Sequence, residues 1–145
     1  MPKNTTHGNP LTAVMEDYLE AIYHIAEGNG GIARPTQISQ NLNVHRSTVT
    51  TALHTLQKLG FIDYAPYRDI KLTPKGAQEA QGIIRRHDTL YRLLHILLGV
   101  EKDEAAKLAC EMEHTLAPAI AGKFIALVEK ALHKHESGKK GGKKS

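Results

Sequence analysis

The stretch PTQISQNLNVHRSTVTTALHTLQKLGFIDYAPYRDIKLT, residues 35–73, indicates the fold of this 145-residue chain most directly. Pro35 suits the first position of a short helix, and a second helix with an apolar stripe follows a tight turn and ends at Gly60. The remainder is typical of two short strands joined by a turn at residues 65–69. A short helix, a turn, a second helix and a two-stranded hairpin in this order predict a winged helix-turn-helix.

The side of the second helix opposite the apolar stripe carries short hydrogen-bonding side chains and one arginine. Serine and threonine can contact phosphates or base edges in the major groove, and arginine can bind guanine through two hydrogen bonds. Side chains in the turn between the strands suit contacts with the DNA backbone. The alternative is an ordinary solvated helix face, but two helices and a wing together favour DNA binding. The predicted DNA-binding residues are His45, Arg46, Ser47, Thr48, Thr50, Thr51, Tyr67 and Arg68.

The distribution of charge agrees with this interpretation. The formal net charge is +4, and the four lysines of the C-terminal GKKGGKKS account for all of it. The charges of the other residues sum to zero, but they are unevenly distributed. Residues 36–86, which include the predicted DNA-binding segment, carry +4, and the segments on either side are negative. We expect the lysine-rich tail, residues 137–145, to be disordered and solvated, like the leader at residues 1–10.

Several features predict a cytoplasmic protein with no membrane segment. No apolar run approaches the roughly 20 residues that a membrane-spanning helix needs. The N-terminal MPKNTTHGNP lacks the apolar core of a secretion signal. Cys110 is the only cysteine, so the chain cannot form an internal disulfide, which agrees with a reducing compartment.

The spacing of apolar residues predicts that the rest of the chain is helical. A helix is expected over residues 11–27, where a stripe at spacings of three and four consists of Leu11, Val14, Tyr18, Ile22 and Ile25. Further helices are expected at about 74–98, 101–115 and 117–135. The predicted fold class is therefore mainly α, with an N-terminal winged helix-turn-helix followed by an all-helical domain.

The run CEMEH, residues 110–114, places possible metal ligands on a helix. Cys110, Glu113 and His114 are separated by three and four positions, so they project from one face. Asp17 and Glu20 repeat the spacing of three near the edge of the predicted core. Carboxylates at such an edge need a bound cation, an ion pair or water. Each group taken alone is more often a solvated surface feature than a metal site.

Five stretches of this chain resemble the metal-dependent repressors, the family of the diphtheria toxin repressor and the manganese transport regulator. In order, they are MEDYLEAIY, VHRSTVTTALHTLQKLGFI, YRDIKLTPKG, RRHDTLYRLL and CEMEH. The resemblance implies a homodimer that binds palindromic operator DNA when Fe(II) or Mn(II) is present as corepressor. Such a protein represses genes of iron or manganese homeostasis. The domains expected are a leader at 1–10, a winged helix-turn-helix at 11–75, a helical metal-binding and dimerisation domain at 76–136 and a tail at 137–145.

The resemblance also implies a set of metal ligands drawn from both domains, namely Asp17, Glu20, His87, Cys110, Glu113 and His114. Asp17 matches the manganese-sensing branch of the family, whereas Cys110 matches the iron-sensing branch. An ancillary site of the longer members is not expected, because Tyr91 and Ala106 stand at two of its ligand positions. Oxygen and imidazole ligands suit Mn(II), and a thiolate moves the preference towards Fe(II), Co(II) or Zn(II).

Fe(II) is favoured slightly over Mn(II), and Co(II), Ni(II) or Zn(II) can substitute in vitro.

Two alternatives belong to other classes of protein. A small metalloenzyme could use the same carboxylates, histidines and thiol, but it does not need the DNA-binding half. A winged-helix regulator that is not gated by metal would keep the DNA-binding half and leave the metal ligands without a function. We therefore predict a metal-dependent repressor and not an enzyme.

Overall fold

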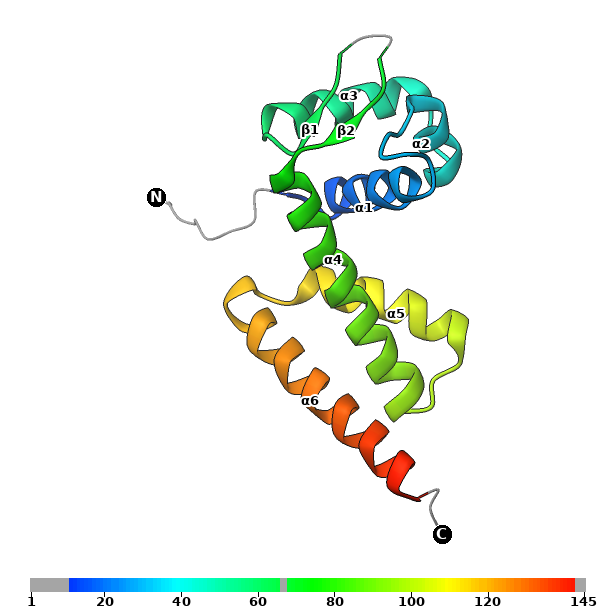
Figure 1. The fold of residues 1–145 in the computed structure, drawn as a ribbon, viewed down its shortest axis with the longest axis vertical. Helices are drawn as coiled ribbons and strands as arrows, with labels where there is room; N and C mark the ends of the chain where they lie inside the picture. The colour runs from blue at the N-terminus through cyan, green and yellow to red at the C-terminus, as the bar shows by residue number, and fades with distance from the viewer. Residues whose placement is uncertain (1–10, 66–67, 143–145) are drawn as a thin grey trace. The chain divides into compact units, whose positions relative to one another are not determined.

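The computed structural model describes residues 11–65 and 68–142. These residues form two compact units, Leu11–Ile84 and the part that begins at Arg85. The described residues contain six α-helices, one π-helical turn and one sheet of two strands (Figure 1). The predicted fold class, mainly α with a winged helix-turn-helix before a helical domain, is confirmed. Within the described ranges, no helix is long and apolar enough to cross a membrane.

Helix α1 (Ala13–Glu27) is capped by Thr12, whose hydroxyl accepts a hydrogen bond from the backbone N–H of Met15 at 3.2 Å. This contact satisfies one of the free donors in the first turn. Val14, expected in the apolar stripe, is 58% exposed. The expectation was wrong for Val14, which lies in the first turn of the helix, whereas the buried apolar residues of α1 begin at Tyr18. The buried residues of α1 are Glu16, Tyr18, Leu19, Ala21, Ile22 and Ala26.

The helix-turn-helix consists of α2 (Pro35–Leu42) and α3 (Arg46–Lys58). Asn43 makes the turn possible with a left-handed backbone, φ 56°, which asparagine tolerates better than most residues. The hydroxyl of Ser39 donates to the carbonyl of Val44 at 2.6 Å and closes the turn. The short turn between the two helices is therefore held by local hydrogen bonds.

The wing is an antiparallel pair of strands, β1 (Ile62–Asp63) and β2 (Lys71–Leu72). A separate bridge connects Ala33 with Ile70, and each backbone N–H donates to the carbonyl of the other residue at 2.9 and 2.8 Å. The two predicted strands are confirmed. The bridge was not predicted, and it ties the wing to the segment just before α2.

Helix α4 (Pro74–Arg92) starts against the end of α3. The hydroxyl of Thr73 donates to the carbonyl of Gly60 at 2.7 Å and accepts from the N–H of Gly76 at 3.0 Å. A Cβ atom on Gly76 would lie 1.9 Å from the carbonyl oxygen of Phe61. Only glycine fits at this position without moving the backbone.

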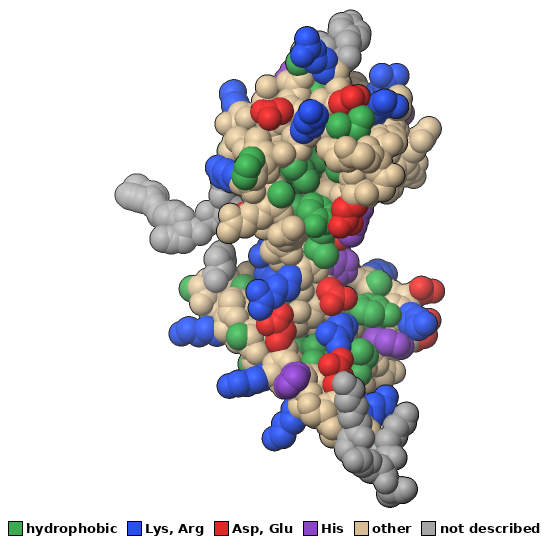
Figure 2. Space-filling view, viewed as in Figure 1, with side chains coloured by type: hydrophobic (Ala, Val, Ile, Leu, Met, Phe, Trp, Pro, Cys, Tyr) green, Lys and Arg blue, Asp and Glu red, His purple; other side chains and the backbone are tan. Residues whose placement is uncertain are grey.

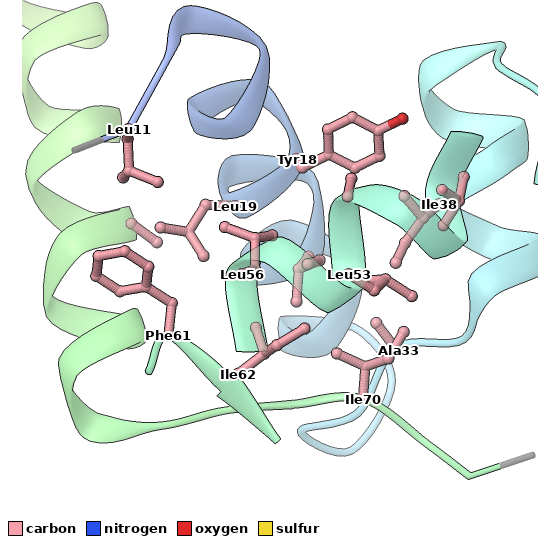
Figure 3. Packing of buried hydrophobic residues seen from close by; sticks show 14 of the residues in the cluster. Leu11, Tyr18, Leu19, Ala33, Ile38, Leu53, Leu56, Phe61, Ile62 and Ile70 are labelled. Atoms are coloured by element: carbon pink, nitrogen blue, oxygen red, sulfur yellow. The ribbon is translucent and has the colours of Figure 1, made fainter. Parts of the chain in front are cut away.

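The core of the first unit lies between α1, α2, α3, the wing and the start of α4 (Figure 3). It contains aliphatic side chains and two aromatic rings, Tyr18 and Phe61. Burying each large aliphatic side chain stabilises the fold by about 1.5–3 kcal/mol. The largest fully buried side chains of this unit are Leu19, Ile22, Ile38, Val49, Leu53, Leu56, Ile62, Ile70 and Ile83.

The second unit contains the end of α4, a π-helical turn η1 (Leu93–Leu97), α5 (Lys102–Thr115) and α6 (Pro118–Gly142). One continuous α-helix over 74–98 had been expected, and this was wrong. The N–H of Leu98 donates to the carbonyl of Leu93 across a wider turn, and Gly99, with φ 72°, then redirects the chain. The core of this unit consists of Leu90, Leu94, Ala105, Ala109 and Ile125.

Helix α6 continues to Gly142, although a helix to about 135 and a disordered tail from 137 had been expected. Residues 137–142 are therefore helical, and only 143–145 of the tail lie outside the described residues. Lys139 in the last turns carries a charge that favours the C-terminal end of a helix. Ion pairs also anchor α6 to α4, since Arg85 binds Glu129 at 2.6 Å and Arg92 binds Glu136.

Candidate nucleic-acid interface and metal-binding groups

The first half of α3 presents the predicted recognition residues to solvent. His45, Arg46 and Ser47 are exposed, as are Thr48 and Thr51, and Thr50 is half-buried. The opposite face of α3 is buried in the core through Val49, Ala52, Leu53 and Leu56. The apolar stripe therefore orients the helix, and it leaves the polar residues free to enter a groove of DNA.

Two of the predicted DNA-binding threonines on α3 donate hydrogen bonds within the helix. Thr50 Oγ1 donates to the carbonyl of Arg46 at 3.0 Å, and Thr51 Oγ1 donates to that of Ser47 at 3.2 Å. Each hydroxyl hydrogen is thereby used, while the methyl group and an oxygen lone pair remain. The methyl suits contact with a thymine methyl, and the oxygen can accept from the amino group of cytosine or adenine.

A concave surface of about 480 Å³ lies between α2, α3 and the wing, and we call it the α2–wing concavity. Three arginines from separate segments, Arg34, Arg46 and Arg68, line it, and Asp69 is the one carboxylate among its lining residues. Arg34 Nε donates to Asp69 Oδ1 at 3.2 Å, which holds this guanidinium beside the wing. The other lining residues are Pro35, Thr36, Thr50, His54 and Tyr64.

His54 and Tyr64 join α3 to the wing within this concavity. Their rings meet edge to face, with centroids 5.9 Å apart. On the face shown in Figure 2, Lys and Arg side chains also lie at the end of the first unit that carries the wing. The sequence prediction did not include Arg34, Thr36, His54 or Tyr64. Tyr67, which it did include, lies outside the described residues.

The predicted metal ligands of the first unit, Asp17 and Glu20, lie on α1. Asp17 is exposed and Glu20 is half-buried. Glu20 Oε2 lies 3.7 Å from Nε2 of His24, one turn further along the helix. Both carboxylates supply the hard oxygen donors that Mn(II) and Fe(II) accept.

The other four predicted ligands lie in the second unit, with His87 on α4 and three residues on α5. Cys110 Sγ lies 3.6 Å from His114 Nε2. A carboxylate oxygen of Glu113 lies within 4.8 Å of a ring nitrogen of His114. Glu111, the second acidic residue of CEMEH, is exposed. The structure therefore brings a thiol, a carboxylate and an imidazole together on one face of α5.

These distances fit a single divalent ion. A thiolate at 2.3 Å and an imidazole at 2.0–2.1 Å from a tetrahedral ion would be separated by about 3.5 Å. The separation between Cys110 and His114 is close to this value. Glu113 is buried, with 4% of its side chain exposed, and a carboxylate in that position needs a positive partner. Arg86 Nη2 lies 3.5 Å from Glu113 Oε2 and supplies one positive charge.

Two family descriptions match this chain. Residues 10–70 match the N-terminal DNA-binding domain of the iron-dependent repressors, and residues 73–140 match their metal-binding and dimerisation domain. Among similar proteins, an HTH-type transcriptional regulator of Methanocaldococcus jannaschii is 36% identical over 120 residues, which cover 83% of this chain and 96% of the relative. The HTH-type transcriptional regulator MntR of Geobacillus kaustophilus is 38% identical over 106 residues, 73% of this chain and 74% of the relative.

Solved structures have the same fold. The manganese regulator SloR superimposes with a TM-score of 0.68 at 24% identity, over 82% of this chain and 53% of SloR. The IdeR of T. acidophilum superimposes with a TM-score of 0.63 at 27% identity, over 86% of this chain and 55% of that protein. The chain spans about half the length of these two proteins.

Proposed function

Because the chain belongs to the iron-dependent repressor family of metal-dependent transcriptional regulators, we propose that α3 and the wing bind operator DNA and that six side chains bind the divalent metal that controls this binding. The members of this family are transcriptional regulators, so the metalloenzyme alternative is excluded. The metal-binding description of the second domain disfavours a regulator that ignores metal. A divalent metal, DNA and a second copy of the chain are its partners.

Base reading is assigned to the exposed first half of α3. Arg46 presents five N–H donors on a planar group that matches the O6 and N7 acceptors of guanine. Thr50 and Thr51 present methyl groups and acceptor oxygens beside it, because their hydroxyl hydrogens are used within the helix. The support for this assignment is that α3 buries its apolar face and exposes these side chains.

Backbone positioning is assigned to the α2–wing concavity. Besides the base-reading Arg46, Arg34 and Arg68 line it and carry more positive charge than Asp69 offsets, and a DNA phosphate is the anion that such a surface meets beside a recognition helix. Asp69 holds Arg34 at the wing, which reduces the side-chain freedom that binding would otherwise remove. We therefore add Arg34, Thr36, His54 and Tyr64 to the DNA-binding residues.

A palindromic operator follows from a two-fold dimer. Each subunit would place its α3 in a major groove, with half-site centres about 34–36 Å apart, or a multiple of one helical turn. Selection of DNA from a random pool by the metal-loaded protein tests this point. Inverted repeats with that spacing support the proposal, and selected sequences without two-fold symmetry contradict it.

The proposed metal ligands are Asp17, Glu20, His87, Cys110, Glu113 and His114. The main support is the geometry of α5, where a thiol and an imidazole lie 3.6 Å apart beside a buried carboxylate. When bound, the metal would supply a positive charge among these carboxylate, thiolate and imidazole ligands. Metal affinity and DNA affinity are then coupled, as any linkage between two ligands requires.

Fe(II) is proposed as the metal, slightly ahead of Mn(II), because Cys110 offers a thiolate among oxygen and nitrogen ligands. The absorption spectrum of the Co(II)-loaded protein tests this ligand. Thiolate ligation gives an intense near-ultraviolet charge-transfer band, which should be absent in Cys110→Ser and retained in Glu111→Gln, an exposed control on the same helix. Cys110→Glu should raise the response to Mn(II) relative to Co(II). A wild-type spectrum without the band would leave Cys110 as a packing residue and favour manganese.

A further inference from the structure

Two neighbouring arginines on α4 bind carboxylates in different surroundings. Arg85 binds Glu129 of α6, and the two side chains are 65% and 33% exposed. Arg86 lies 3.5 Å from Glu113 of α5, and these side chains are 28% and 4% exposed. Water reaches both side chains of the first pair, whereas the second pair includes an almost fully buried carboxylate. A buried carboxylate is destabilising unless a positive charge compensates it.

We propose that Arg86 is the counter-ion of Glu113 when no metal is bound, and that it must leave this carboxylate for metal to bind with full affinity. This inference rests on the proposed role of Glu113 as a metal ligand. A carboxylate ligand lies about 2.0–2.2 Å from its ion, so a divalent charge at Glu113 would lie within a few ångströms of the guanidinium. Two positive groups at that distance repel each other.

Arginine cannot relieve this repulsion by losing its proton, because the guanidinium stays charged at any physiological pH. The side chain must therefore move, and its partly exposed position and long stem give it a path to water. Arg86 thus stabilises the apo protein by compensating the buried negative charge of Glu113, and at the same time it lowers the affinity of the site for metal. A residue in this role sets the metal concentration at which the protein responds.

This role predicts two effects of opposite sign when the charge is removed. In Arg86→Gln the buried carboxylate loses a positive neighbour, so the apo protein should melt at a lower temperature. The metal no longer has to displace a cation, so the dissociation constant for metal should fall by about tenfold or more. A tenfold change requires the variant to remove only a modest share of the repulsion between two charges that lie a few ångströms apart. An arginine with a merely structural role would lower both the stability and the metal affinity.

The experiment measures the melting temperature of the chelator-treated full chain and the dissociation constants for Mn(II) and Co(II) by calorimetry at pH 8. Arg85→Gln is the matched control, because it removes the neighbouring ion pair at a carboxylate that is one third exposed. It should lower the melting temperature slightly and leave both dissociation constants unchanged.

Lower apo stability with tighter metal binding in Arg86→Gln, but not in Arg85→Gln, supports the inference. Unchanged or weaker metal binding in Arg86→Gln overturns it. If Arg86→Gln does not fold, Arg86→Lys decides. Its strongly hydrated ammonium on a flexible stem should leave Glu113 for water more readily than the guanidinium does, so this variant should bind metal more tightly than wild type. Equal or weaker metal binding overturns the inference. A wild-type protein that binds neither metal overturns the proposed function itself.

Discussion

Arg34→Gln offers a quantitative test of the DNA interface. The side chain lines the α2–wing concavity and is 59% exposed, and its Nε is held 3.2 Å from Asp69. Removing one phosphate interaction with double-stranded DNA should reduce the slope of log affinity against log salt by about 0.9. If the affinities of variant and wild type meet at 1 M salt, this change of slope corresponds to about an eightfold loss of affinity per subunit at 0.1 M salt. Two subunits on one operator lose about sixtyfold, with a slope change of about 1.8.

The assay is fluorescence anisotropy of the metal-loaded protein with its selected operator and with a scrambled duplex, each at several salt concentrations. Because a phosphate carries no sequence information, Arg34→Gln should weaken both duplexes by the same factor. Arg46→Ala provides the contrast, since removal of a base-reading side chain should cost about 1–3 kcal/mol on the operator and less on the scrambled duplex. Arg85→Gln, far along the chain and paired with Glu129, should leave both slopes unchanged.

The reasoning is refuted if Arg34→Gln keeps the wild-type salt slope on both duplexes. It is also refuted if the weakening is confined to the operator, because Arg34 would then read bases. Circular dichroism of each variant must match that of the wild type, so that the comparison concerns binding and not folding.

Two further predictions concern stability. Gly76→Ala should lower the free energy of unfolding by about 3 kcal/mol or more, because the added Cβ would lie 1.9 Å from the carbonyl oxygen of Phe61. Gly122→Ala is the control and should be neutral or stabilising, because nothing lies within 4 Å of the added Cβ. Urea titrations measure both variants, and an equal effect of the two would contradict the packing argument. The hydrogen bond from Arg85 lowers the pKa of Glu129 below its ordinary value of 4.5, so this pair stabilises the fold above that pH, and the stabilisation is lost as the pH falls through the lowered pKa. Glu129→Gln should therefore cost at most about 1 kcal/mol at pH 7, given the exposure of the pair. Urea titrations at a series of pH values measure this cost, and a cost that does not decline as the pH is lowered below 4.5 would contradict this account.

The sequence predicted those parts of the fold that depend on neighbours along the chain. The tight turn at Asn43 and the short strands of the wing are local features, and so is the buried stripe of α3. The spacing of Cys110 and His114 by four residues likewise required them to share a face of α5. Helical periodicity is sufficient for inferences of this kind.

Contacts between residues that are far apart in the sequence could not be predicted from helical periodicity. Arg34 and Asp69 are 35 residues apart, and Arg85 and Glu129 are 44 residues apart. Nothing in the local sequence states which of several carboxylates an arginine will bind, because many pairings have similar energies until the core fixes the backbone. The α2–wing concavity was missed for this reason, since three separate segments build it.

The ends of helices were also difficult to predict. The π-helical turn at Leu93–Leu97 continues the apolar pattern of α4, so periodicity gave no sign of the change. The run of glycines and lysines after residue 137 has the composition of a disordered tail, yet α6 continues to Gly142. An ion pair between Arg92 and Glu136 anchors α6 close to this point. Such a tertiary contact overrides weak local preferences.

The most direct test of the central claim, that metal controls DNA binding, is operator affinity measured with and without metal on a folded protein. Chelator-treated protein should keep its helical circular dichroism and bind the selected operator weakly. Added Mn(II), or Fe(II) without oxygen, should tighten operator binding by a factor in the range typical of allosteric coupling, about 5–150-fold. Operator DNA should tighten metal binding by the same factor, because linkage is reciprocal. Equal operator affinity with and without metal, on a protein that binds metal, would contradict the account.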